Sequence, residues 1–456
     1  MKKILLSALL LCLALIAGCG SDNTNSNQAT AYWTWMSGDN STLQAGSYGT
    51  KGIPSPTNKP GARYGAVSWT DNSGNMWLFG GEGYDGIGNL SYLNDLWRWD
   101  GANWTWISGP STGNTAANYG TKGVAVATNI PGGRKEAVSW VDNTGNFWLF
   151  GGQGIVDTSG NGGWLNDLWR WDGANWTWVS GDNILSQAGV YGTKGTVAAG
   201  NKPGGRSGAV SWKDQSGNLW LFGGLGYDTN GTWSYLNDLW KWDGTNWTWM
   251  SGSNLTGQYG SYGTKGVSAS SNTPGSRRYA VSLVDRNGSF WLFGGDGQAK
   301  SVSGYLNDLW KWDGTNWIWV AGDDQPTISA TYGTKGIAAP TNKIGGRMQA
   351  NAWIDNSGNF LFFGGNGTAG NGVTGSSLND LWRWDGTYWT WVAGDSSSAQ
   401  GGIYGTNGVT SATNTPGARY GASSWIDKSG DIWMFGGYGY ASTTFPGYLN
   451  DLWRYK

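Results

Sequence analysis

Histidine is absent from the 456-residue sequence, and cysteine occurs only at Cys12 and Cys19. Without histidine there is no nucleophile activated by an imidazole and no imidazole-bound zinc, copper or haem. With both cysteines so close to the N-terminus, no disulfide can link the rest of the chain. Only 13% of residues are charged and the net charge is −1. We therefore expect no metal, no cofactor and no nucleic-acid partner.

Long apolar runs are also lacking, apart from one at residues 4–17 that follows Lys2 and Lys3. It is too short to span a bilayer comfortably and is typical of a secretory signal peptide. It ends in Leu-Ile-Ala-Gly-Cys19, which resembles the lipoprotein box of bacteria. The resemblance implies cleavage before Cys19 and a lipid on that cysteine, which anchors the protein to a membrane of the cell envelope. Gly20 after it favours the outer membrane; a plain signal peptide is the alternative.

The chain divides into three segments on these grounds. Residues 1–19 are assigned to the lipoprotein signal peptide. The polar, Asn-rich residues 20–31 predict a flexible tether. Residues 32–456 are assigned to one folded domain.

Glycine and tryptophan are abundant instead, with 80 and 35 residues, and they recur in a repeated pattern. Leu-Asn-Asp-Leu-Trp, a Trp-x-Trp pair and an arginine after a glycine-rich turn each occur six times in the same order. Phe-Gly-Gly also occurs six times, at intervals of 70 to 72 residues, beginning at Phe79, Phe150, Phe222, Phe293, Phe363 and Phe435. Such a period indicates a repeat architecture.

Each repeat contains four short strand-like runs, which in the first complete repeat are residues 64–69, 76–81, 95–99 and 104–107. Alternating side chains and many tryptophans favour half-buried strands, and turn residues separate the first from the second and the third from the fourth. Helical periodicity is absent from this part. Four antiparallel strands in six copies predict an all-β fold, a six-bladed β-propeller.

The repeat resembles the kelch repeat. The resemblance rests on the glycine pair after the second strand, the Trp-Asp that ends the third, and the tryptophan of the fourth, and it extends from Trp33 to Tyr455. The unit is longer than the usual kelch repeat of about 50 residues. The resemblance implies a propeller, as predicted from the strands.

The two ends of the domain predict how the ring closes. The domain starts with a fourth strand, at Trp33 to Trp35, and stops after a third strand, at Asp451 to Tyr455. We expect the N-terminal strand to complete the last blade, which leaves no sheet edge unpaired at the closure.

The length of the repeats varies only between Phe-Gly-Gly and Leu-Asn-Asp, where the Leu follows the Phe by 13 to 15 positions. In a four-stranded meander this connection leaves from the same face as the long connection to the next blade. We call that face the loop face and the opposite one, which carries the tight turns, the turn face. Because loops on a rigid scaffold usually carry function, a binding site is expected on the loop face.

Basic and acidic residues at the start of the first strand are candidate ligand groups. A ring of arginines suits carboxylates or phosphates, although six-fold recurrence favours a structural role in holding a loop or pairing with the Asp of Leu-Asn-Asp. The residues after the arginine break the symmetry, and Glu136 is weighed as a catalytic carboxylate. The candidates are Arg63, Arg134, Lys135, Glu136, Arg206, Arg277, Arg278, Arg347, Gln349 and Arg419.

Aromatic residues near the variable connection are candidates for sugar stacking. Tyr84, Tyr227 and Tyr440 share one position after the glycine pair, and Trp233 lies in the same region. Aromatic faces beside Asn and Asp side chains suit sugars, whereas local loop packing is the alternative. Tyr-Gly-Thr-Lys-Gly, which recurs in the long connection with asparagine for lysine in the last copy, is interpreted as structural.

Two functional hypotheses follow. The first is a monomeric, lipid-anchored binding or scaffold protein of the cell envelope that recognises a glycan or an envelope protein through the loop face. The second is a periplasmic sugar-processing enzyme, because some bacterial kelch propellers are similar to sialic-acid mutarotases. A purely structural surface protein is a third possibility.

Overall fold

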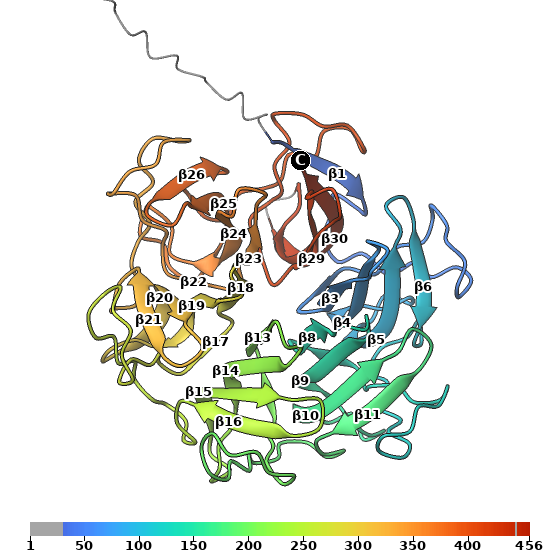
Figure 1. The fold of residues 1–456 in the computed structure, drawn as a ribbon. Helices are drawn as coiled ribbons and strands as arrows, with labels where there is room; N and C mark the ends of the chain where they lie inside the picture. The colour runs from blue at the N-terminus through green and yellow to red at the C-terminus, as the bar shows by residue number, and fades with distance from the viewer. Residues whose placement is uncertain (1–30, 443–444) are drawn as a thin grey trace, which may run out of the picture. The chain divides into compact units, whose positions relative to one another are not determined.

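Six antiparallel sheets are arranged as blades around a central axis (Figure 1). The structure is a computed structural model that describes residues 31–442 and 445–456. Residues 32–456 form one compact unit. The described part of this unit contains β-strands and no helix. The all-β prediction and the six-bladed propeller of four-stranded blades are confirmed. The proposed signal peptide, Cys19 and nearly all of the tether lie outside the described residues.

The first three blades follow one another along the chain, and each has its innermost strand divided into two short segments. Blade 1 contains β2 (Arg63–Tyr64), β3 (Val67–Thr70), β4 (Met76–Tyr84), β5 (Leu90–Trp99) and β6 (Trp104–Ser108). Blade 2 contains β7 (Arg134–Lys135), β8 (Val138–Val141), β9 (Phe147–Ile155), β10 (Gly162–Trp171) and β11 (Trp176–Ser180). Blade 3 contains β12 (Arg206–Ser207), β13 (Val210–Lys213), β14 (Leu219–Tyr227), β15 (Trp233–Trp242) and β16 (Trp247–Ser251).

The last three blades repeat this arrangement, except that blade 6 takes its outer strand from the N-terminus. Blade 4 contains β17 (Arg277–Arg278), β18 (Val281–Val284), β19 (Phe290–Gln298), β20 (Ser303–Trp312) and β21 (Trp317–Ala321). Blade 5 contains β22 (Arg347–Met348), β23 (Asn351–Ile354), β24 (Phe360–Gly367), β25 (Ser376–Trp384) and β26 (Trp389–Ala393). Blade 6 contains β27 (Arg419–Tyr420), β28 (Ser423–Ile426), β29 (Ile432–Tyr440), β30 (Pro446–Tyr455) and β1 (Trp33–Ser37).

Two expected strand boundaries are wrong. The third strand begins several residues before the predicted start, at Leu90 in blade 1, because it continues the pairing with β4 beyond the glycine pair. The first strand is interrupted after Tyr64 instead of being continuous, and Gly65 at the break has a φ of 67°. A residue in the left-handed region cannot continue a strand, so the chain bends there.

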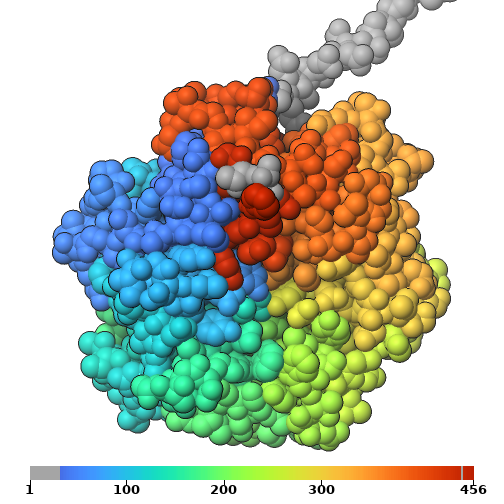
Figure 2. Space-filling view, turned by 180° about the vertical axis from the view of Figure 1, so that it is seen from behind, coloured from blue at the N-terminus to red at the C-terminus, as the bar shows by residue number. Residues whose placement is uncertain are grey.

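The N-terminal strand closes the ring as predicted. β1 pairs with β30 in antiparallel register, with Trp33 opposite Tyr455 and Trp35 opposite Trp453. The Tyr32 amide donates a hydrogen bond of 2.8 Å to the carbonyl of Lys456. The first and last parts of the propeller therefore lie side by side (Figures 1 and 2).

The hydrophobic core is divided among the spaces between neighbouring blades. Between blades 1 and 2, Trp69 stacks on Phe147 with ring centroids 5.1 Å apart, and Phe79 packs against Trp176. Aromatic side chains thus fill the wedge between two twisted sheets, and burial of their large surfaces stabilises the ring. This explains why each repeat needs so many tryptophans.

The long connections between blades leave from the loop face but then run along the outer edge of the next blade. In blade 1 the amide of Gly52 donates to the carbonyl of Trp106 on β6, at 2.7 Å, and the Lys51 ammonium lies 4.4 Å from the Trp106 ring centroid. The connections therefore cover the edges of the outer strands, which would otherwise be exposed to solvent. The structural interpretation of Tyr-Gly-Thr-Lys-Gly is confirmed, since its lysines pack on outer tryptophans.

Candidate functional site

Each blade presents a row of three side chains beside the central axis at the loop face. In blade 1, Tyr64 on β2 lies opposite Glu82 on β4, which lies opposite Tyr92 on β5. The same register holds in every blade. We call these residues the mouth rows. The other five rows are Lys135-Gln153-Trp164, Ser207-Leu225-Tyr235, Arg278-Asp296-Tyr305, Met348-Asn366-Ser377 and Tyr420-Tyr438-Tyr448.

The mouth rows vary between blades, although each of their positions adjoins an invariant residue of the repeat. Each first residue follows the repeated arginine, each second residue follows the glycine pair, and each third precedes Leu-Asn-Asp. Across the six blades the rows carry eight aromatic residues, four charged residues and several amides and hydroxyls. Most of these side chains are partly exposed, so this variable part of the inner surface is open to solvent.

A closed ring of backbone hydrogen bonds lies at the axis, next to the mouth rows. Its six members each donate to the carbonyl of the preceding blade's member, at 2.7 to 3.0 Å, and all six have positive φ. We call this the axial ring. Its members are Gly65, Glu136, Gly208, Tyr279, Gln349 and Gly421.

The side chains of the axial ring lie over its glycines and cover the axis. A Cβ on Gly208 would lie 2.4 Å from the Tyr279 ring, and one on Gly421 would lie 2.6 Å from the Tyr64 ring. Glu136 lies in the same way over Gly65. Glycine is needed at Gly208 and Gly421 because the neighbouring rings leave no space for a Cβ, and glycine takes the positive φ at no steric cost.

Glu136 is the centre of this cover. Its carboxylate accepts hydrogen bonds from the hydroxyls of Tyr64 and Tyr279, and the residue is only 7% exposed. Burial and the adjacent carboxylate raise the pKa of both phenols well above its usual range, so they stay hydrogen-bond donors. Glu136 has a φ of 57°, a conformation that costs a non-glycine residue about 1–3 kcal/mol and that clusters at functional sites.

The mouth rows contain two charged pairs, of which the first lies beside Glu136. The Lys135 ammonium contacts Glu82 Oε2 at 2.9 Å, and the Tyr448 hydroxyl donates to the same oxygen at 3.1 Å. Burial opposes the charge on Lys135, but the two glutamates outweigh it and raise the pKa of the ammonium. The second pair, Arg278 and Asp296, lies in blade 4, with Nε to Oδ2 at 3.1 Å.

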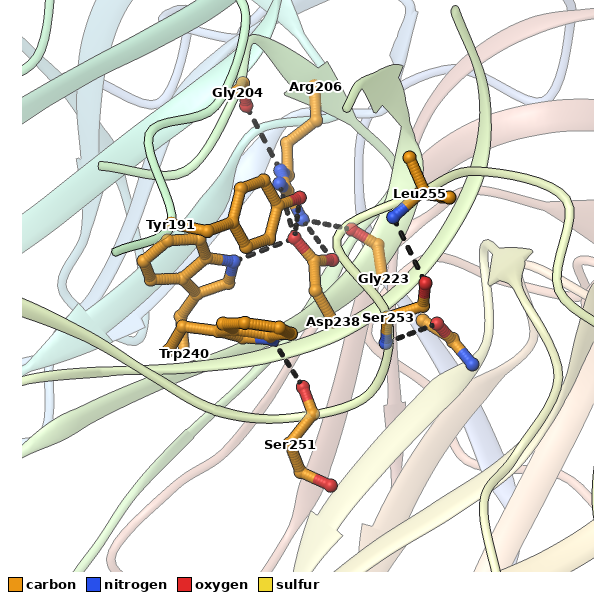
Figure 3. Close-up of polar contacts among 11 residues, drawn as sticks. Tyr191, Gly204, Arg206, Gly223, Asp238, Trp240, Ser251, Ser253 and Leu255 are labelled. Carbon is orange, nitrogen blue, oxygen red and sulfur yellow. Dashed lines mark hydrogen bonds and ion pairs between the residues drawn. The ribbon is translucent and has the colours of Figure 1, made fainter. Parts of the chain in front are cut away.

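The six repeated arginines do not face the axis. Arg206 in Figure 3 is buried, donates from both terminal nitrogens to Asp238 at 2.7 and 2.8 Å, and donates from Nε to the carbonyl of Gly204. Tyr191 and Trp240 donate to the same carboxylate. Every blade contains this arrangement, so the expectation of an arginine ring for ligands is corrected to the structural alternative. The arginines concerned are Arg63, Arg134, Arg206, Arg277, Arg347 and Arg419.

The four aromatic candidates lie around the mouth rows. Tyr84 packs edge-on against Tyr448 of blade 6, with centroids 5.9 Å apart. The rings of Tyr227 and Trp233 both pack against that of Trp164 in blade 2, with centroids 6.1 and 5.1 Å away, respectively. Trp233 is 46% exposed. Tyr440 ends β29 and is partly exposed. Lys135 and Arg278 belong to the mouth rows, and Glu136 and Gln349 belong to the axial ring, so these eight candidates all lie on the loop face.

Sequence reasoning missed several members of the site. Tyr92, Trp164 and Tyr448 precede Leu-Asn-Asp, and Asp296 follows a glycine pair. An alignment of the six repeats against one another provides the signal, because these columns vary beside the invariant glycine pair and the invariant leucine of Leu-Asn-Asp. Variation in the column after the arginine points to the site in the same way.

The channel below the axial ring is narrow and then widens. A cavity of about 170 Å³ is lined by the axial ring and by the alanines that follow it. A second cavity, of about 480 Å³, is lined toward the turn face by residues that include Ser68, Ser139, Ser282 and Ser424. Within residues 31–442 and 445–456, no group of three Asp, Glu, Cys or His side chains could hold a metal ion. The same residues contain no helix long and apolar enough to cross a membrane.

Comparison with known proteins gives fold-level similarities only. No family model and no curated protein matches the sequence. The structure of YjhT is similar at 14% identity and a TM-score of 0.48, over 86% of this chain and 95% of that one. A protein of unknown function from Dyadobacter fermentans DSM 18053 is similar at 11% identity and a TM-score of 0.48, over 94% and 99%. A copper-bound fungal alcohol oxidase of the AA5 family is similar at 14% and 0.42, over 89% and 76%. Similarities this distant carry no information about a ligand or a reaction.

Proposed function

We propose that this protein is a non-enzymatic binding protein of the cell envelope, a kelch-type propeller that binds a glycan at its mouth rows. The observation that carries the proposal is that these rows, at one end of the axis, differ from blade to blade, whereas the buried arginine–aspartate arrangement is the same in all six blades. A purely structural ring has no need for eight aromatic and four charged residues at one end of its axis. A glycan is also favoured because the site combines aromatic faces with amides and hydroxyls, which suits C–H faces and hydroxyl groups of sugars.

The position of the chain ends supports access to this site. β1 begins beside Lys456 at the turn face, so the chain enters the propeller at the face opposite the mouth. If Cys19 carries a lipid, as the resemblance of residues 15–19 to a lipoprotein box implies, the attachment point lies at the turn face and leaves the mouth unobstructed. The proposed localisation is the cell envelope, with an anchor in the outer membrane.

A glycan array with soluble protein starting at Gly20 tests the proposal. We expect selective binding that is lost in Tyr92→Ala and in Trp233→Ala. Tyr388→Ala is the matched control, because Tyr388 is 42% exposed but lies in a tight turn at the turn face. Retention of binding in both mouth variants refutes the site. Failure to bind any glycan refutes the glycan proposal and favours a protein partner, to be sought by capture from envelope extracts.

A specific observation also favours the second candidate, a sugar-processing enzyme resembling sialic-acid mutarotases. Glu136 is a buried carboxylate in a strained conformation, and a carboxylate so placed can transfer protons as a general acid or base. NMR exchange between anomers of a reducing sugar tests this candidate. Acceleration by the wild type that disappears in Glu136→Gln, with sugar binding retained, supports an enzyme. No acceleration of any tested sugar refutes it.

A further inference from the structure

Arg278 is held in the mouth in a way that leaves its guanidinium edge open. The guanidinium carbon lies 4.8 Å from the Tyr279 ring centroid and 5.6 Å from that of Tyr235 in blade 3. Asp296 accepts from Nε at 3.1 Å and is itself fixed by the Tyr235 hydroxyl at 2.8 Å. These contacts fix the plane of the group. Among residues 31–442 and 445–456, neither terminal nitrogen of Arg278 has a hydrogen-bond partner.

The other cations of the inner surface are used differently. The six repeated arginines place both terminal nitrogens on a buried aspartate, as Arg206 does. The Lys135 ammonium is paired with Glu82, and Glu136 lies beside it. Arg278 is 27% exposed at the side chain and has a single contact to Asp296. The guanidinium of Arg278 is held in orientation through Nε, while its two terminal nitrogens remain available. These nitrogens provide two parallel N–H donors for a planar oxyanion.

We propose that Arg278 binds the carboxylate of an acidic sugar residue, so that the ligand class is an acidic glycan such as a polyuronate. This inference rests on the proposed glycan function and names its charge. Asp296 selects among anions, because it places a negative charge on the Nε side of the guanidinium. A monoanionic, planar carboxylate fits the open edge, whereas a phosphate dianion is repelled more strongly by Asp296.

The neighbouring residues suit the rest of such a sugar. Tyr305 lies opposite Asp296 in the same row, and Asn366 and Ser377 form the polar row of the next blade. Tyr279, which supports the guanidinium from one side, also donates to Glu136. A carboxylate on Arg278 therefore places a sugar ring among aromatic faces and hydrogen-bonding groups at the axis.

The test compares oligogalacturonate with its methyl ester, which keeps the sugar backbone but removes the charge. Affinities are measured by calorimetry for the wild type, Arg278→Gln and Arg278→Lys. Arg286→Gln is the control, because Arg286 carries the same charge in the same blade but lies in a turn at the turn face. A sugar phosphate serves as the second anion.

We expect the free acid to bind the wild type more tightly than the ester. Arg278→Gln should weaken acid binding by about 10- to 100-fold, as for the loss of hydrogen bonds to a charged group, and ester binding by less than about twofold. Arg278→Lys should give an intermediate loss, and Arg286→Gln none. Unchanged melting temperatures of the variants confirm that they fold.

Three results overturn the inference. Equal affinity for acid and ester, or equal loss of both in Arg278→Gln, removes the role of the carboxylate but leaves the glycan function standing. Tighter binding of the sugar phosphate than of the uronate contradicts the selection by Asp296. If neither oligogalacturonate nor its methyl ester binds, and no glycan on the array binds, the proposed function itself is refuted.

Discussion

Removal of one buried carboxylate should destabilise the propeller far more than removal of one surface charge. Asp238 is fully buried in blade 3 and accepts four hydrogen bonds of 2.7 to 2.8 Å, two from Arg206 and one each from Tyr191 and Trp240 (Figure 3). Asp238→Asn keeps the shape but leaves the guanidinium without a counter-charge and turns an amide N–H toward donors. An uncompensated buried charge costs about 3–5 kcal/mol.

Two variants in the same blade set the scale. Tyr191→Phe removes one of the four hydrogen bonds to the carboxylate and should cost about 1.5–3 kcal/mol, as for a hydrogen bond to a charged group. Lys202→Gln removes a partly exposed ion pair with Asp182, whose side chains are 29% and 25% exposed, and should cost less than about 1 kcal/mol. The expected order of free-energy loss is therefore Asp238→Asn, Tyr191→Phe, Lys202→Gln.

Urea denaturation is the appropriate assay, because an uncharged denaturant does not screen the ion pairs. Free energies of unfolding are compared only where the m-values agree, so that the variants unfold over the same surface. A loss in Asp238→Asn no larger than that in Lys202→Gln would refute the assignment of the repeated arginines to the fold. It would also reopen a ligand role for them.

Three further predictions concern closure, the axial ring and pH. Deletion of β1 should leave β30 as an open edge and yield a protein that melts at lower temperature and aggregates, as measured by scanning calorimetry and light scattering. Gly208→Ala should cost about 1–3 kcal/mol more than Gly231→Ala, because both have positive φ but only the first places a Cβ against the Tyr279 ring; equal losses in urea melts would contradict the packing. Stability should fall as pH rises above about 10, because burial raises the pKa of all six long-loop tyrosines and the unfolded phenol ionises first; melting temperatures that stay constant to pH 11 would contradict it.

Most of the fold could be predicted from the repeated sequence pattern. Six copies of one strand pattern fixed the number of blades, and the unmatched strand at Trp33 fixed the closure, because a sheet edge needs a partner. The break after Tyr64 was not predictable from strand propensity. It depends on the backbone ring at the axis, which demands positive φ in six residues at once.

The site was recovered only in part. Glu136 and Arg278 were found because they depart from the repeat, and the same criterion applied to every column would have found Tyr92 and Asp296. The contact between Glu136 and Tyr279 could not be predicted from the sequence, because the two residues are 143 positions apart and lie two blades from one another. It arises from convergence at the axis, where side chains from non-adjacent blades meet.

Closure by β1 also determines how the domain responds to mechanical load. A pull on the chain before Tyr32 acts first on the pairing of β1 with β30, because the hydrogen bonds of Tyr32 to Lys456 lie at the end of β1 nearest the attachment point. Trp33 resists the first step, because its ring is buried against Phe363 of blade 5, with centroids 5.3 Å apart. Load on the N-terminus is therefore carried by the contacts of β1 in blade 6, the one described blade whose strands are not contiguous in the sequence.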